Sequence, residues 1–256
     1  MKRLVSVSFL LVFMVLTAMA QDFPVTRHAY IAKFLKSKIT ALIWYEETED
    51  GDLSGEIIYT SSKHQTPIRI FGTAYDMEDG ICRHQLFEYQ ADGEQSGHFE
   101  IDRDPRTSKL RAHWGDMRND DSQRTYTMRL TSTAFPAGKG GTFTKTDDIT
   151  GRYVYKYQHH FKGSQGGTVI INHLKGNTEA EYLSITKNDP QIAEINSHAI
   201  FHNGCYSDEL EDCGYQFVLY VFKDFVRVKT TSGLNKEYDC FGAFTTLDGF
   251  YLRVPE

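Results

Sequence analysis

Residues 108–114 (SKLRAHW) and 124–130 (RTYTMRL) decide the fold class of this chain, because polar and apolar side chains alternate along both stretches. In the first, Leu110, Ala112 and Trp114 point to one side and basic residues point to the other. Alternation with a period of two residues is typical of antiparallel strands that have one buried face and one face in water. The sequence therefore predicts β-strands here.

Comparable runs continue toward the N-terminus, and turn-forming residues separate them. They are residues 39–45, 54–60, 66–72, 83–89 and 97–103. A meander of this size gains by curling into a barrel or a sandwich, which protects its edges. Residues 25–38 (VTRHAYIAKFLKSK) place apolar side chains at helical spacing and predict a helix, although the same residues suit a strand.

The second half of the chain continues the β pattern. Its predicted strands are residues 151–157, 166–172, 180–186, 197–202, 215–222, 225–230 and 248–254. Residues 215–222 (YQFVLYVF) are apolar on both faces, which predicts a central strand of the second core. Residues 189–195 (DPQIAEI) offer a cap and a first-turn proline and predict a short helix, again with a strand as the alternative. We expect an all-β protein of two packed antiparallel domains, each barrel-like or sandwich-like.

A signal peptide and a linker divide the chain. Residues 1–20 combine Lys2 and Arg3, an uncharged apolar run and Ala18-Met19-Ala20, the pattern of a secretory signal peptide. Residues 135–151 (FPAGKGGTFTKTDDITG) are rich in glycine and poor in large apolar side chains. The expected boundaries are therefore a signal peptide at 1–20, an N-terminal β-meander domain at 21–135, a linker at 136–148 and a C-terminal β domain at 149–256. The exported protein is expected in the periplasm, at the cell surface or outside the cell.

The charge of the chain argues against two classes of partner. Without Lys2 and Arg3 it carries 26 basic and 34 acidic side chains, a formal charge of −8. Nucleic acids and anionic lipids both require a basic face. No apolar stretch after the signal approaches the length of a membrane span. We expect no nucleic-acid partner and no membrane insertion.

The four cysteines are interpreted through the export signal, because an oxidising compartment favours disulfides over metal or redox sites. Cys213 precedes the strand-like run 215–230, and Cys240 follows it. A disulfide between them would tie the start of one strand to the end of the next across a hairpin, and we predict this pairing. Cys82 and Cys205 lie in different halves. They are either free and buried, which we favour, or a second bridge.

The two halves resemble exported all-β proteins of Gram-negative bacteria. The first half, with LSGEIIY, PIRIFG, LFEY, SGHFEID and LRAHW, resembles a secreted β-meander domain. The second half is similar to an exported domain with a cysteine before a strand, then C-x-G and a closing D-G-x-Y, here Cys213, Cys240, Gly242, Asp248, Gly249 and Tyr251. Some relatives of that domain accompany lysozyme-inhibitor-like segments, so the resemblance implies inhibition of a cell-wall hydrolase as one function. Residues 232–238 (SGLNKEY) depart from the spacing of the inhibitory loop, and no functional residue is carried over.

Side chains that could perform chemistry form no catalytic or metal motif. His198 and His202 would lie about 13 Å apart on a strand, too far to share one ion. The acids among residues 46–52 and 116–121 fall in loops, where solvated charge is the ordinary explanation, and they lack the register of a calcium loop. We predict no catalytic residue, no metal and no cofactor, and we expect a protein that is not an enzyme. A hydrolase with carboxylates from separate loops is the least favoured alternative.

Surface recognition is the remaining class of function. Tyr153, Tyr155 and Tyr157 share one face of a predicted strand, and a row of exposed tyrosines suits sugar rings or a protein interface. The competing interpretation places these rings in the core of the second domain. The sequence thus predicts an exported, non-catalytic binding protein that recognises a glycan or an envelope protein, with a lysozyme-type inhibitor as the alternative.

Overall fold

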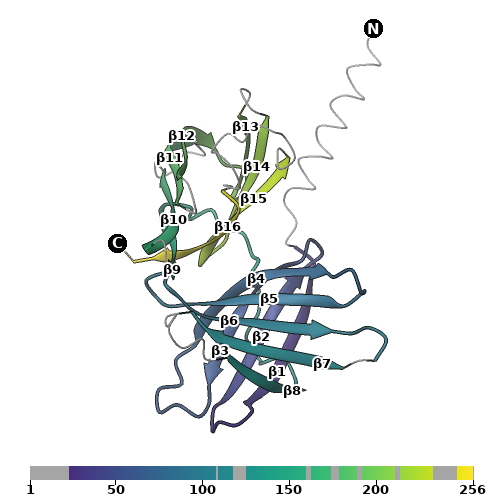
Figure 1. Cartoon of the computed structure of the whole chain (residues 1–256). Helices are drawn as coiled ribbons and strands as arrows, with labels where there is room; N and C mark the ends of the chain where they lie inside the picture. The colour runs from purple at the N-terminus through teal and green to yellow at the C-terminus, as the bar shows by residue number, and fades with distance from the viewer. Residues whose placement is uncertain are drawn as a thin grey trace.

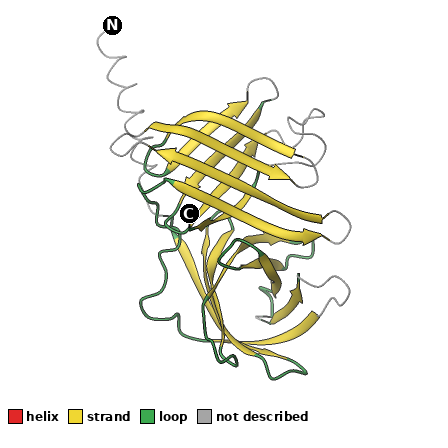
Figure 2. Ribbon diagram, turned by 90° about the vertical axis from the view of Figure 1, so that its left-hand side faces the viewer, coloured by secondary structure: helices red, strands yellow, loops and turns green. Residues whose placement is uncertain are grey.

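The computed structural model describes residues 23–107, 109–117, 125–159, 163–173, 179–188, 192–210, 214–232 and 247–255. These residues form sixteen β-strands and contain no helix. The predicted all-β class is therefore confirmed. The strands build two sheets of eight, one closed into a barrel and one nearly closed (Figures 1 and 2).

The first sheet is an up-and-down barrel in which each strand pairs with the next in sequence. Its strands are β1 (Val25–Phe34), β2 (Thr40–Thr48), β3 (Asp52–Tyr59), β4 (Ile68–Asp76), β5 (Cys82–Tyr89), β6 (Gln95–Arg103), β7 (Leu110–Asp116) and β8 (Thr125–Ser132). Pairing of β1 with β8, from Tyr30 with Ser132 to Phe34 with Met128, closes the ring. Seven of the eight strands coincide with runs predicted from the alternation.

The helix predicted over residues 25–38 is wrong, because these residues form β1. His28, Tyr30, Ala32 and Phe34 all point into the barrel at a spacing of two and are buried. The closing strand of a barrel pairs on both sides, here with β2 and β8. That backbone pairing outweighs the helical spacing of the apolar side chains.

Bulky side chains fill the barrel interior. The buried set includes Ile43, Leu53, Ile70, Leu86, Phe99 and Ile101 from five different strands. Gly72 marks a point where two strands approach closely, since a Cβ there would lie 1.8 Å from the carbonyl oxygen of Gln85. Eight strands enclose just enough space for such side chains, so the middle of the barrel is a packed core.

The second sheet has the strand order β12-β11-β10-β9-β16-β15-β14-β13. Its strands are β9 (Gly151–His159), β10 (Gly163–His173), β11 (Glu179–Asn188), β12 (Ile192–Ile200), β13 (Cys205–Leu210), β14 (Tyr215–Val221), β15 (Phe225–Ser232) and β16 (Gly249–Val254). The described part of the helix predicted at 189–195 is the start of β12. β14 is not central: it lies next to the edge strand β13, which the sequence analysis missed.

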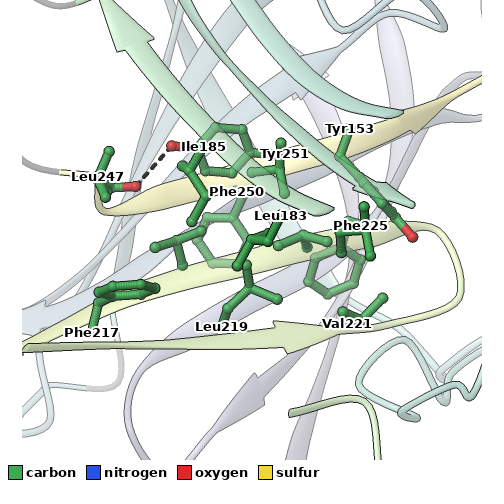
Figure 3. Packing of buried hydrophobic residues seen from close by; sticks show 14 of the residues in the cluster. Tyr153, Leu183, Ile185, Phe217, Leu219, Val221, Phe225, Leu247, Phe250 and Tyr251 are labelled. Carbon is green, nitrogen blue, oxygen red and sulfur yellow. Dashed lines mark hydrogen bonds between the residues drawn. The ribbon is translucent and has the colours of Figure 1, made fainter. Parts of the chain in front are cut away.

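The concave face of the second sheet holds the larger core (Figure 3). Tyr153 and Tyr251 lie in it and donate hydrogen bonds to the carbonyl oxygens of Ile149 at 2.9 Å and Leu247 at 2.8 Å. Each ring therefore buries a large apolar surface while its hydroxyl keeps a partner, as buried tyrosines usually do. β14 contributes a strictly alternating set of buried residues from Tyr215 to Val221.

The two sheets share a packed interface. Phe71, on the outer face of the barrel, stacks on Phe250 at 5.6 Å and contacts Phe225 at 4.7 Å, measured between ring centroids. The buried Arg227 donates from Nε to Asp52 Oδ1 at 2.9 Å and also pairs with Asp248. Figure 1 shows β4 and β5 on the side of the barrel that faces the second sheet. Apolar packing and a buried ion pair thus join the sheets.

The segment between the two sheets lies against the barrel. Glu46, fully buried on the outer face of β2, accepts hydrogen bonds from the Gly141 amide at 3.1 Å and the Thr142 amide at 2.8 Å. Phe143 and Ile149 of the same segment are buried in the second core. The residues predicted as a linker, 136–148, are thereby held in place at several points.

Some sequence predictions concern residues outside the described ranges. The signal peptide at 1–20, Cys213 and Cys240 all lie there. Cys82 and Cys205 are described, and both are free. Among the described residues, no helix is long and apolar enough to cross a membrane.

Candidate site at the pocket end of the barrel

Three side chains with metal-binding or acid–base chemistry converge inside one end of the barrel. His28 from β1, Glu47 from β2 and His84 from β5 point into the lumen at the end where β1 begins and β2 ends, here called the pocket end. β5 is not a neighbour of β1 or β2 in the sheet, so His84 reaches the other two across the lumen. Closure of the barrel is what brings the three together.

The two imidazoles approach one carboxylate oxygen. His28 Nε2 lies 2.6 Å from Glu47 Oε2, and His84 Nε2 lies 3.7 Å from the same oxygen. The rings of His28 and His84 meet edge to face with centroids 5.2 Å apart. His84 is fully buried, His28 is 6% exposed and the Glu47 side chain is 20% exposed. The cluster is therefore sheltered, with its carboxylate nearest to solvent.

Tyr45 contacts the other ring nitrogen of His84, Nδ1. Its hydroxyl lies 2.8 Å from His84 Nδ1. When His84 donates from Nδ1 to the Tyr45 oxygen, Nε2 presents a lone pair toward Glu47 and His28. Nε2 has no hydrogen-bond partner in the structure, although it is buried. A buried polar atom without a partner costs free energy and is uncommon in native proteins.

Burial and neighbouring charge set the protonation of the cluster. Burial lowers the pKa of His84 to about 4, the attraction of Glu47 opposes this, and the charges of His28 and Arg103 add to the lowering. For Glu47 burial acts to raise the pKa, but the hydrogen bond from His28 and the nearby cationic groups outweigh it and hold the pKa below its usual value. At neutral pH the cluster therefore offers a neutral His84 imidazole and an ionised carboxylate.

A pocket of about 520 Å³ opens beside this cluster. Its lining residues are Tyr30, Cys82, Arg103, Asp104, Pro105, Lys109, Leu110 and Ser132. Arg103 connects pocket and cluster, because its Nη1 lies 4.0 Å from Glu47 Oε2. Burial raises the pKa of the Cys82 thiol, as do the nearby carboxylates of Glu47 and Asp76, so this cysteine stays protonated.

The charge of the pocket is positive. Asp104 Oδ1 accepts from the Arg106 amide at 2.9 Å and from Arg106 Nε at 3.1 Å, so the Asp104 charge is paired with the Arg106 guanidinium. Arg103 and Lys109 remain as charges that line the space. The lining therefore favours an anionic group, although the chain as a whole is acidic.

The opposite end of the barrel, here called the far end, holds a second buried acid. Glu88 of β5 accepts from the Tyr59 hydroxyl, from Ser96 Oγ at 2.9 Å and from Trp114 Nε1 at 3.1 Å. Gly97 leaves the room for this arrangement, since a Cβ there would lie 2.7 Å from Trp114 Nε1 and 3.0 Å from Glu88 Oε2. Glu88 is thus surrounded by donors and closed to a ligand.

The residues predicted to bind a ligand fall elsewhere. Tyr153 and Tyr155 are buried, so for these two rings the core interpretation holds and the exposed row does not exist. The reason is that the face of β9 that carries them lines the concave side of a curved sheet. The side chain of Tyr157 lies outside the described residues. The predicted disulfide of Cys213 with Cys240 is likewise outside the described residues.

The acids of residues 46–52 were interpreted as solvated loop charge, and this is wrong for three of them. Glu46 is buried on the outer face of the barrel, Glu47 enters the lumen and Asp52 pairs with Arg227. Three different environments exclude one shared calcium loop for these side chains. His198 and His202 are exposed.

The cluster at the pocket end was missed by the sequence analysis. His28 and Glu47 alternate with apolar residues on strands that pair with each other, and that signal was available in the sequence. His84 lies far along the chain and requires the closed topology to be placed. Comparison with protein-family models, with curated proteins and with solved structures finds no match for this chain.

Proposed function

We propose that this chain is an exported, non-catalytic binding protein of the cell envelope that recognises an acidic glycan at the pocket end of its barrel. The observation that carries the proposal is the pocket of about 520 Å³ with Arg103 and Lys109 in its lining. Small eight-stranded barrels hold one compact ligand at most, and ligand sites in barrels lie in their mouths. Export is supported by the signal-like sequence of residues 1–20.

An anionic sugar fits the chemistry of this lining. A guanidinium binds a carboxylate or sulfate in a bidentate manner, and the ammonium of Lys109 adds a second positive charge. The Tyr30 and Ser132 hydroxyls and the apolar side chains of Pro105 and Leu110 supply the mixed surface that a sugar ring needs.

The test is calorimetric titration with oligosaccharides that contain uronic acids, with sulfated oligosaccharides, and with neutral oligosaccharides of the same length. We expect binding of an acidic series and a loss of at least about tenfold in Arg103→Gln and in Lys109→Gln. Arg111→Gln is the matched control, because this exposed arginine of β7 does not line the pocket. Equal affinity for neutral sugars, or no effect of the two pocket substitutions, would contradict the proposal.

A protein partner is the other outcome that this test must separate. If the pocket instead binds an envelope protein, none of the oligosaccharides should bind in the titration. Inhibition of a lysozyme-type hydrolase stays a prediction of the resemblance, and most of residues 232–238, on which it bears, lie outside the described ranges.

A further inference from the structure

We infer that His28, Glu47 and His84 form a binding site for a divalent transition-metal ion of the zinc class inside the pocket end of the barrel. The proposed function does not require this metal site, and metal binding at it does not depend on binding of a glycan. The argument rests on the type of the donor atoms, their convergence and the unpartnered nitrogen of His84.

The donor set suits the metal. Two imidazole nitrogens and one carboxylate are ligands typical of zinc sites that keep an open position, and the same set binds other first-row dications. One donor atom from each of the three residues lies within 4.8 Å of the other two. Three protein ligands leave coordination room for water or for a ligand atom.

The distances fit after a small adjustment. With bonds of about 2.0–2.1 Å, two ligand atoms of a tetrahedral site lie about 3.3 Å apart. His84 Nε2 and Glu47 Oε2 are 3.7 Å apart and must approach by a few tenths of an ångström. His28 Nε2 and Glu47 Oε2 are 2.6 Å apart and must separate, which the partly exposed Glu47 side chain permits.

His84 is oriented as a metal ligand is. Metal-binding histidines commonly engage a hydrogen-bond partner through their other ring nitrogen, which fixes the tautomer. Here Tyr45 occupies Nδ1 at 2.8 Å, while Nε2 lies buried without a partner and aims at the cluster. A metal ion would satisfy that nitrogen and remove the cost of leaving it unpaired.

A purely structural hydrogen-bonded trio is the competing explanation, and it accounts for less. It explains the bond between His28 and Glu47 but leaves His84 Nε2 without a role. A trio of this kind would also be expected to satisfy all its buried atoms, as the far-end acid Glu88 does with Tyr59, Ser96 and Trp114.

The experiment is a titration of the purified, metal-stripped protein with Zn²⁺ by calorimetry, repeated with Co²⁺, whose visible absorption reports tetrahedral coordination by nitrogen and oxygen. We expect about one ion per chain in the wild type. His28→Gln, Glu47→Gln and His84→Gln should each lower the affinity by at least about 100-fold, since loss of a ligand exceeds the 10–100-fold cost of losing a supporting residue.

Matched controls separate this site from adventitious binding, which ten histidines in the chain make necessary. His113→Gln removes an exposed histidine from the outer face of β7 and should leave the affinity within about twofold. Cys82→Ser should also retain binding, because the thiol is not among the three converging ligands. Circular dichroism and thermal melting identify variants that fail to fold, and His28→Gln, with the less buried ring, gives a second variant if His84→Gln does so.

Two results would overturn the inference. One is the absence of Zn²⁺ binding by the wild type at micromolar metal. The other is unchanged binding in the folded His28→Gln and Glu47→Gln variants. Either can be obtained whether or not the protein binds an acidic glycan, so failure here and failure of the proposed function are distinguishable.

Discussion

Glu47 and Glu88 are two inward-pointing acids at opposite ends of the same barrel, and their surroundings differ in kind. Glu88 is closed off by three donors from Tyr59, Ser96 and Trp114. Glu47 shares one oxygen between two imidazoles, and the buried Nε2 of His84 beside it has no partner. A fully satisfied buried acid stabilises one structure, whereas an incompletely satisfied cluster beside a pocket is the arrangement expected of a binding site.

The largest effect should come from deleting the two acids. Glu88→Ala leaves three buried donors at the far end without an acceptor and should lower the free energy of unfolding by about 3–5 kcal/mol. Glu47→Ala leaves one buried histidine without its partner and should cost about 1–2 kcal/mol. Chemical denaturation of both variants measures the difference. Equal costs would mean that the cluster at the pocket end is as structural as the one at the far end.

Replacing one partner of each acid by an apolar residue sharpens the contrast. Trp114→Phe removes the donor to Glu88 and some buried volume, and we expect a loss of about 2–3 kcal/mol in the free energy of unfolding. His84→Leu removes a buried nitrogen that has no partner, but it also leaves the buried Tyr45 hydroxyl without its hydrogen bond. We therefore expect a smaller loss than for Trp114→Phe, about 1–2 kcal/mol, while Zn²⁺ binding is lost. A large destabilisation by His84→Leu in the absence of metal would show that the histidine is retained for folding.

The supporting tyrosines should separate stability from binding. Tyr59→Phe removes a hydrogen bond to a buried carboxylate and should cost about 1.5–3 kcal/mol without changing the affinity for Zn²⁺. Tyr45→Phe should cost about 1 kcal/mol but lower that affinity by about 10–100-fold, since it frees His84 to rotate or change tautomer. Melting curves and metal titrations of the two variants check this prediction. A loss of Zn²⁺ affinity in Tyr59→Phe but not in Tyr45→Phe would contradict it.

The smallest stability effect should be that of Arg103→Gln at the pocket end. Its side chain is 41% exposed and its distance to Glu47 is 4.0 Å, so the ion pair contributes little. We expect a change within about 0.5 kcal/mol in the free energy of unfolding. A thermal melt checks it alongside the glycan titration, and a shift of several degrees would place Arg103 among the structural residues of the barrel.

The fold was predictable from the sequence to the level of strands. Alternation located β2 to β8 and most of the second sheet, because a sheet with one buried face imposes a period of two on its residues. It failed at residues 25–38, where the spacing of apolar residues suits a helix and only barrel closure selects the strand. It also missed β13, a short edge strand with a half-buried pattern.

The candidate site was less predictable, for a physical reason. Glu47 is surrounded in sequence by other acids, a composition that predicts a solvated loop. Only the strand pairing shows that Glu47 points into the barrel while Glu46 points outward. His84 joins His28 and Glu47 through contacts across the lumen, between strands that are not neighbours in the sheet. Contacts of that kind leave no mark on local composition. Conversely, the tyrosines of β9 had a clear pattern, but the direction of their face depends on the curvature of the sheet.

Closure of the barrel by β1 and β8, and the pairing of β9 with β16 in the second sheet, also set the order of events when the chain folds. In each sheet, the first strand made pairs with the last, so neither sheet can be completed until its final strand is available. Pairings between strands so far apart in sequence form slowly, because a long loop must close before they contribute. The barrel can therefore close once β8 (Thr125–Ser132) is available, whereas the second sheet must wait for β16 (Gly249–Val254), close to the C-terminus. A truncation that removes β16 should leave the barrel able to close and prevent the second sheet from forming around β9.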